Sequence, residues 1–238
     1  MRENRYGLCV PQSPMFHVMN SFAQPFPDRR AAGIQLAHAI RLRATPTPSL
    51  VLGLPRGGVP VAYEVARALH VPLDVMPVRK IGMPGNPEVA IGAIAGSTVV
   101  RDADPAAQMP TRVFEVLLRS ERAELRRRER TYRRGLPPLK LQGMSVLLVD
   151  DGLATGCTML AAVREARRLK ATVVVAAAPI ASDNAEALLR TEADTVITLD
   201  IAVNLSSVGE WYDDFEQVAD SEVCELLAHS ALAAGSLT

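Results

Sequence analysis

The chain has 238 residues, with 26 Lys and Arg against 26 Asp and Glu, so its formal net charge at pH 7 is zero. Hydrophobic residues make up 48% and charged residues 22%, which is typical of a globular protein that buries a substantial core. The zero balance argues against a protein whose whole surface binds nucleic acid or an anionic membrane, although it allows a local basic site.

The first part of the chain is predicted to alternate helices and strands after an N-terminal arm. Residues 1–28 mix Pro, Ser, Asn and aromatic residues without periodicity, so we predict an arm there and a single domain over residues 29–238. The predicted elements of this part are, in chain order, a helix over 29–43, a strand over 50–54, a turn at 55–58, a helix over 59–69, a strand over 71–78, a loop over 79–88 and two short strands within 91–100.

A long charged helix is predicted over residues 111–134. Residues 112–134 hold nine Arg and four Glu, a local net charge of +5, and Leu118, Leu125 and Tyr132 recur seven residues apart as an apolar stripe. We expect this helix to lie on the sheet or at a dimer contact with its charged face in water. Contact with nucleic acid is the alternative, and the zero net charge of the chain argues against it.

The last third of the chain again alternates strands with helices. The predicted elements are a strand over 145–149, a turn over 150–158, a helix over 159–169, a strand over 171–178, a helix over 183–191 and a strand over 195–199. Such alternation predicts an α/β fold with a mostly parallel sheet and helices on both faces. Ligands bind outside the carboxyl ends of such strands, so the loops after Leu54, Val78 and Val149 form the candidate site.

The loop after Val149 carries the strongest chemical signal. Residues 146–158 read VLLVDDGLATGCT, in which an apolar strand is followed by two carboxylates and a loop of small residues that opens a helix. Backbone N–H groups at such a helix start form a cradle for a phosphate group. Asp150 and Asp151 would repel that phosphate, so we expect them to bind two vicinal ribose hydroxyl groups or a metal ion.

This segment resembles the signature of the type I phosphoribosyltransferases, which bind 5-phosphoribosyl-1-pyrophosphate (PRPP). The resemblance implies that Asp150 and Asp151 hold the ribose 2- and 3-hydroxyl groups. Two residues depart from the signature: Gly152 stands where a branched apolar residue is usual, and Cys157 stands where Gly or another small residue is common. We interpret Cys157 as a small residue, with a redox-sensitive thiol as the alternative. The loop that would wrap the 5-phosphate consists of Ala154, Thr155, Gly156, Cys157 and Thr158.

Two upstream segments also resemble parts of this family. Residues 54–62 read LPRGGVPVA and resemble its pyrophosphate loop, in which Arg56 would bind phosphate oxygens while Gly57 and Gly58 permit close backbone approach. In the family this loop often has an unusual backbone geometry, which Gly57 could accommodate. Arg79 and Lys80 end the next predicted strand, and we expect both to face the same crevice and neutralise the departing pyrophosphate.

Residues 83–92 resemble the mobile loop that family members close over the substrate. Glu88 is the one acid of this loop and a candidate to accept a proton from a nucleobase. Some purine-salvage relatives place an acidic base at the position of Ala154, and its absence here favours adenine-type or unrelated acceptors.

Residues 204–218 form the only stretch dense in aromatic residues. The family builds a small hood over the acceptor from its terminal segments, so Trp211 or Tyr212 would stack on a base and the backbone near Val208 would read base edges. The alternative is that Trp211, Tyr212 and Phe215 fill the edge of the core.

The resemblance therefore implies an enzyme that uses Mg²⁺ and PRPP to transfer a phosphoribosyl group to a nitrogen acceptor, a nucleobase by preference, with release of pyrophosphate. The alternatives are a non-catalytic PRPP-binding regulatory protein and a flavodoxin-like module for another phosphorylated ligand. Three scattered Cys residues and a longest apolar run of only residues 171–181 lead us to expect a cytoplasmic protein without a membrane partner. We also expect a homodimer.

Overall fold

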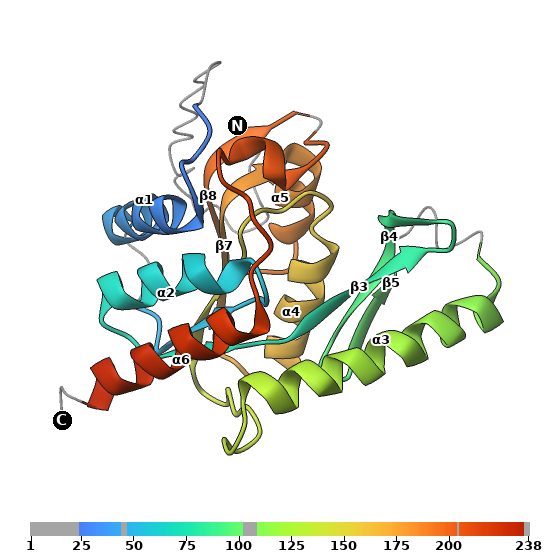
Figure 1. Ribbon diagram of the computed structural model, residues 1–238, viewed down its shortest axis with the longest axis horizontal. Coiled ribbons are helices and arrows are strands. Elements are labelled where there is room, and N and C mark those ends of the chain that lie inside the picture. The colour runs from blue at the N-terminus through green and yellow to red at the C-terminus, as the bar shows by residue number, and fades with distance from the viewer. Residues whose placement is uncertain (1–23, 44–46, 102–108, 204, 236–238) are drawn as a thin grey trace, which may run out of the picture.

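The computed structural model describes residues 24–43, 47–101, 109–203 and 205–235, and it does not describe the side chains of Pro87, Glu88 and Ala234. The predicted N-terminal arm therefore lies outside the described residues up to residue 23. A five-stranded parallel sheet forms the centre of the molecule (Figure 1). Its strands are, in spatial order, β2 (Leu73–Val75), β1 (Leu50–Gly53), β6 (Ser145–Val149), β7 (Val173–Ser182) and β8 (Thr195–Ala202).

Helices cover both faces of this sheet because successive strand residues point to opposite sides. Val51 and Leu147 pack against α1 (Arg29–Leu42) and α2 (Gly58–Leu69). Leu52 and Leu148 face the other core cluster, with α4 (Cys157–Arg168) and α5 (Asp183–Leu189). The predicted α/β class, with a mostly parallel sheet between two helical layers, is thus confirmed.

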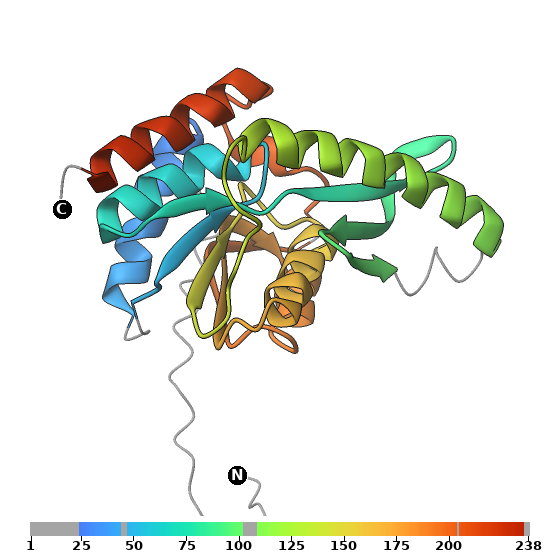
Figure 2. The same ribbon diagram turned by 90° about the horizontal axis from the view of Figure 1, so that it is seen from below.

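A second, antiparallel sheet extends from one side of the main sheet (Figures 1 and 2). It consists of β3 (Val78–Met83), β4 (Asn86–Ala95) and β5 (Thr98–Arg101), and α3 (Thr111–Tyr132) lies across it. Leu118 and Leu125 pack against Ile81 and Ile94 of this sheet. The apolar stripe of α3 therefore lies on a sheet, as one of the two placements predicted.

The predicted strand over 71–78 is present but shorter, and the predicted loop over 79–88 is wrong. The strand stops at Val75, and the chain resumes as β3 in the other sheet after Pro77, which has no N–H to continue a ladder. The two Gly and two Pro of residues 79–88 indicate a loop by composition. Pro84 and Gly85 instead form the turn of the β3–β4 hairpin, where Gly85 has a φ of +80°.

The two terminal segments meet above the carboxyl ends of the main sheet. Phe26 N–H donates to the carbonyl of Trp211 (2.8 Å), and Asp213 N–H donates to the carbonyl of Phe26 (2.9 Å). Trp211 ends the short 3-10 helix η2 (Val208–Trp211). The segment around Phe26 thus pairs with residues 211–213, within the stretch predicted to form the hood.

A C-terminal helix, α6 (Asp220–Gly235), is present where the sequence pattern predicts none. Val223 packs it against Val59 of α2, Val75 of β2 and Tyr132 of α3. Its first residue, Asp220, therefore lies beside the turn that precedes α2. Within the described ranges, none of the helices combines the length and apolar character that crossing a membrane requires.

Candidate functional site

The loops after β1 and β6 lie against each other, because these two strands are parallel neighbours in the sheet. Leu54 N–H donates to the carbonyl of Val149 (2.9 Å). A Cβ atom at Gly58 would lie 2.6 Å from the carbonyl oxygen of Val149, and one at Gly57 would lie 2.6 Å from Cγ of Asp151. The two glycines thus provide the close approach that brings together segments about 90 residues apart.

The turn of residues 55–58 has an unusual backbone at its first peptide. The bond between Pro55 and Arg56 is cis. Gly57 has ordinary helical angles, with φ of −62° and ψ of −31°. The resemblance implied that Gly57 would accommodate the unusual geometry, whereas the structure requires a glycine there for space.

The two adjacent acids after β6 form a tightly packed pair. The N–H of Asp151 donates to Oδ1 of Asp150 (2.9 Å), and the hydroxyl of Tyr212 donates to the carbonyl of Asp151 (2.6 Å). Burial, together with the negative charge of Asp151, raises the pKa of Asp150 well above its usual range. Nε of Arg29 donates to Oδ2 of Asp151 (2.8 Å). Arg29 is absent from the site predicted by the sequence, since it reads only as the start of an amphipathic helix.

The loop from residue 152 to residue 158 is held by the end of β7 and the start of α5. Leu153 N–H donates to the carbonyl of Ile180 (2.9 Å), and the hydroxyl of Ser182 donates to the carbonyl of Ala154 (2.6 Å). A Cβ atom at Gly152 would lie 2.7 Å from Cγ2 of Val208. Val208 of the hood thus fills the space that a branched side chain at position 152 would occupy.

This loop leads directly into α4, which begins at Cys157, two residues before the predicted start. Gly156 has a φ of +74°, a conformation that favours glycine. The first N–H groups of the helix therefore point toward the loop, where the N–H of Cys157 donates to Oγ1 of the exposed Thr155 (3.4 Å) and Thr158 is half-buried. Cys157 itself is 3% exposed within the core. Its burial supports its interpretation as a small packing residue.

Arg79 and Lys80 lie near the start of β3, not at the end of the preceding strand. Adjacent strand residues point to opposite faces, so the expectation that both face one crevice is wrong. Nε of Arg79 donates to Oε2 of Glu121 on α3 (2.7 Å). Lys80 is paired in register with Ala93, which packs toward the core of the main sheet.

Helix α3 adds a second arginine to the turn of residues 55–58. Nη1 of Arg128 lies 3.5 Å from the carbonyl oxygen of Pro55, and its Nε donates to Glu124 (2.9 Å). Glu124 also binds Arg127, and these hydrogen bonds lower the pKa of Glu124 to about 2. Arg128 is buried, although the sequence alone gives no signal that separates it from the other eight Arg of this segment.

Asp220 of α6 gathers three groups around one carboxylate. The hydroxyl of Tyr132 donates to its Oδ1 (2.6 Å), Nη1 of Arg127 donates to its Oδ2 (2.9 Å), and Nη1 of Arg56 lies 3.8 Å from its Oδ1. These contacts lower the pKa of Asp220, with the Tyr132 hydrogen bond as the largest cause. The C-terminal helix therefore contacts the predicted pyrophosphate loop directly.

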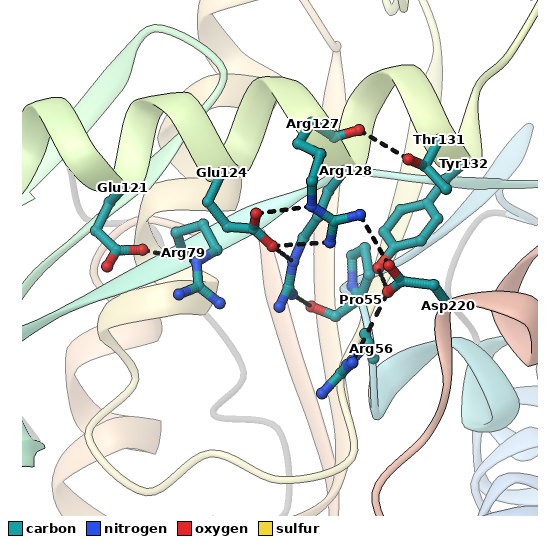
Figure 3. A network of polar contacts seen from close by, with 10 residues as sticks. All are labelled: Pro55, Arg56, Arg79, Glu121, Glu124, Arg127, Arg128, Thr131, Tyr132 and Asp220. Atoms are coloured by element: carbon teal, nitrogen blue, oxygen red, sulfur yellow. Dashed lines mark hydrogen bonds and ion pairs between the residues drawn. The ribbon is translucent and has the colours of Figure 1, made fainter.

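Arginines from three different segments lie on one side of α3. Figure 3 shows the guanidinium groups of Arg56, Arg79 and Arg128 pointing to the same side, while their partner carboxylates come from α3 and α6. The arrangement supplies fork-shaped donors suited to an anion with several oxygens.

In the hood, the aromatic side chains separate into a buried and a partly exposed group. The ring of Tyr212 packs between Phe26 and Phe215, with ring centroids 5.5 and 5.0 Å away, and the residue is 6% exposed. Tyr212 therefore fills the core edge and offers no free face for stacking, contrary to one of the two expectations for it. Trp211 is partly exposed and remains the candidate to stack on an acceptor.

Two further predictions concern the side chain of Glu88 and the binding of a metal ion. The backbone of Glu88 lies in β4, but its side chain is not among those described, so its role stays a prediction. Among the described residues, no three His, Cys, Asp or Glu side chains come together in a way that would hold a metal ion. Two carboxylates, Asp150 and Asp151, are the nearest approach to such a set in the candidate site.

Comparisons with known proteins agree with this geometry. A family model described as the phosphoribosyl transferase domain matches residues 27–214. Two Mycobacterium tuberculosis proteins, provisionally named phosphoribosyl transferases, are 42% identical over 206 residues, which is 85% of this chain and 46% of theirs. The chain thus spans about half the length of these relatives. A crystal structure of a Thermus thermophilus protein matches with 41% identity and a TM-score of 0.71, over 87% of this chain and 99% of that chain.

Proposed function

Since the chain belongs to the phosphoribosyl transferase domain family, we propose that it transfers the phosphoribosyl group of PRPP to a nitrogen acceptor and releases pyrophosphate. The observation that carries this proposal is the contact between the two loops after β1 and β6. Gly57 packs against Asp151, so the arginine-lined turn and the acid pair lie in one site. One side suits a pyrophosphate, and the other suits the hydroxyl groups of a ribose.

Each loop has a distinct task in this proposal. The turn of residues 152–156 and the first N–H groups of α4 bind the 5-phosphate. Asp150 and Asp151 accept hydrogen bonds from the ribose 2- and 3-hydroxyl groups. Arg56 and Arg128 bind the pyrophosphate, and Arg79 contributes positive charge from β3.

The chemical step exchanges one bond at C1 of the ribose for another. The bond from C1 to the pyrophosphate oxygen breaks, with its electron pair leaving on the pyrophosphate, and the acceptor nitrogen forms the new bond to C1. The guanidinium groups stabilise the charge that develops on the leaving group. The proton lost by the acceptor passes to a base, for which Glu88 is the candidate on this chain.

Magnesium fits this site as an ion that accompanies the substrate. Mg²⁺ is commonly held by one or two carboxylates together with substrate phosphates, and Asp150 and Asp151 supply two carboxylates beside the proposed ribose. When bound, the ion would neutralise phosphate charge during the departure of pyrophosphate.

A pyrophosphate-release screen tests the proposal. The protein is given Mg²⁺, PRPP and a panel of purines, pyrimidines and simple amines, and PRPP binding is measured separately by calorimetry. We expect the double variant Asp150→Asn with Asp151→Asn to lose PRPP binding. The control Glu222→Gln with Glu225→Gln removes two exposed carboxylates of α6 and should leave binding unchanged.

Three results would change the proposal. Unaltered PRPP binding by the double Asn variant would show that the site is assigned to the wrong residues. Binding of PRPP without turnover of any acceptor would favour the regulatory protein, and absence of PRPP binding would favour a different phosphorylated ligand. The predicted homodimer is tested separately by light scattering on the same preparation.

A further inference from the structure

Arg29 joins the acid pair to the hood, although no step of the proposed reaction uses it. We infer that Arg29 is a positioning residue that fixes the ribose-binding carboxylate of Asp151 and ties its orientation to the hood. This inference rests on the proposed function, because it assigns Asp151 to the ribose. It concerns an arginine that contacts Asp151 and does not itself contact the reacting atoms.

The guanidinium group of Arg29 is fixed from three directions. Its Nε donates to Oδ2 of Asp151 (2.8 Å), and its Nη1 donates to the carbonyl of Glu216 (2.8 Å). Its Cζ lies 3.8 Å from the centroid of the Phe215 ring, a cation–π contact. The side chain of Arg29 is 12% exposed and that of Asp151 is 15% exposed. An ion pair with so little exposure is weakly screened and holds its geometry well.

This contact leaves Asp151 partly available to a substrate. Arg29 occupies Oδ2, whereas Oδ1 can still accept a hydrogen bond from a ribose hydroxyl group. The positive charge also offsets one carboxylate beside an anionic ligand. The carboxylate is thus held in one orientation before the ribose arrives, which reduces the cost of binding.

The anchor of Arg29 lies in the hood. Phe215 and Glu216 follow η2, and Phe215 also packs against Tyr212, whose hydroxyl binds the Asp151 backbone. A shift of this segment would move the guanidinium group and, with it, the carboxylate. The acceptor side and the ribose side of the site are therefore mechanically connected through one side chain.

The ion pair of the neighbouring Arg30 has only a structural role and contrasts with the ion pair between Arg29 and Asp151. Arg30 binds Glu64 of α2 at 3.0 Å, but its side chain is 73% exposed. That pair links two helices, α1 and α2. Arg29 is instead buried against the loop, and a Cβ atom at Gly57 would lie 3.1 Å from its Nε.

Calorimetric binding to Arg29→Gln tests the inference with two probes, ribose 5-phosphate and Mg²⁺-pyrophosphate. Loss of a charge-assisted hydrogen bond should weaken ribose 5-phosphate about 10- to 100-fold and change pyrophosphate less than about threefold. Arg29→Lys keeps the charge without the fork and should recover part of the loss. The control Arg41→Gln, on the exposed end of α1, should behave as the wild type.

Three outcomes would overturn the inference. One is wild-type affinity of Arg29→Gln for ribose 5-phosphate, and a second is tighter binding, which would make Arg29 a blocking residue. The third is an equal loss for both probes, which would indicate general damage to the fold. Failure of the wild-type protein to bind PRPP would overturn the proposed function itself, and this result is distinguished because it needs no variant.

Discussion

Substitution of Gly57 by Ala should damage the site while leaving the fold intact. The added Cβ atom would overlap Oδ2 of Asp151 and lie 2.6 Å from its Cγ, so the carboxyl group must move by more than about 0.8 Å before both atoms reach an ordinary contact distance of 3.4 Å. The backbone angles of Gly57 suit any residue, so the substitution adds no conformational strain. A displacement of nearly 1 Å can cost up to about 100-fold when a site depends on positioning.

We expect Gly57→Ala to weaken PRPP binding by about 10- to 100-fold in calorimetry, with a stability loss of about 1–3 kcal/mol, because displacing the Asp151 carboxylate also disturbs its ion pair with Arg29. The second background Asp151→Ala removes the overlapping Cγ atom, so there Gly57→Ala should not lower the melting temperature further. Wild-type PRPP affinity of Gly57→Ala, or an equal fall in melting temperature in both backgrounds, would refute this account of the loop contact.

For three further substitutions, the structure determines the direction of the effect on stability or binding. The raised pKa of Asp150 means that the folded protein holds this proton more tightly than the unfolded chain does, so stability is lost as the pH rises above about 4. The melting temperature of Asp150→Asn should therefore fall less between pH 4 and pH 8 than that of the wild type. Equal slopes of melting temperature against pH in the two proteins would contradict this. Gly152→Val should lower the free energy of unfolding by about 1–3 kcal/mol through overlap with Val208. Adding Val208→Ala should restore much of the lost stability. If denaturant titrations show no such recovery, the contact between positions 152 and 208 is wrong. Asp220→Asn should lower the melting temperature yet tighten pyrophosphate binding, because Arg56 loses a nearby carboxylate, and weaker calorimetric binding would contradict the assignment of Arg56.

The acid loop and its place in the sheet could be predicted because their signals are local. Apolar residues 146–149 specify a buried strand, and the small residues that follow specify a turn into a helix. That this loop meets the turn of residues 55–58 is a long-range fact. It depends on β1 and β6 being neighbours, which periodicity alone could not show; the resemblance implied only that both loops bind one substrate.

The errors arose where local composition and tertiary packing disagree. Pro84 and Gly85 indicate a loop, yet they occupy only the turn of a hairpin whose flanking residues pair. Helix α6 has apolar residues without a strong contrast between its faces, so its sequence gives little helical signal, and its placement depends on contacts with three other elements. Arg29 and Arg128 look like surface charges in sequence, and only the fold shows them to be buried beside the site.

The pairing of Phe26 with the segment around Tyr212 determines how far the chain can be shortened from its front. Deleting residues up to 28 would damage the hood, because it would remove three backbone hydrogen bonds with residues 211–214 and one face of the packing around Tyr212. It would also remove Asp28, whose carboxylate accepts from Ala31 N–H (2.6 Å) and caps the helix that begins with Arg29. The smallest piece that retains an intact site must therefore start before residue 26.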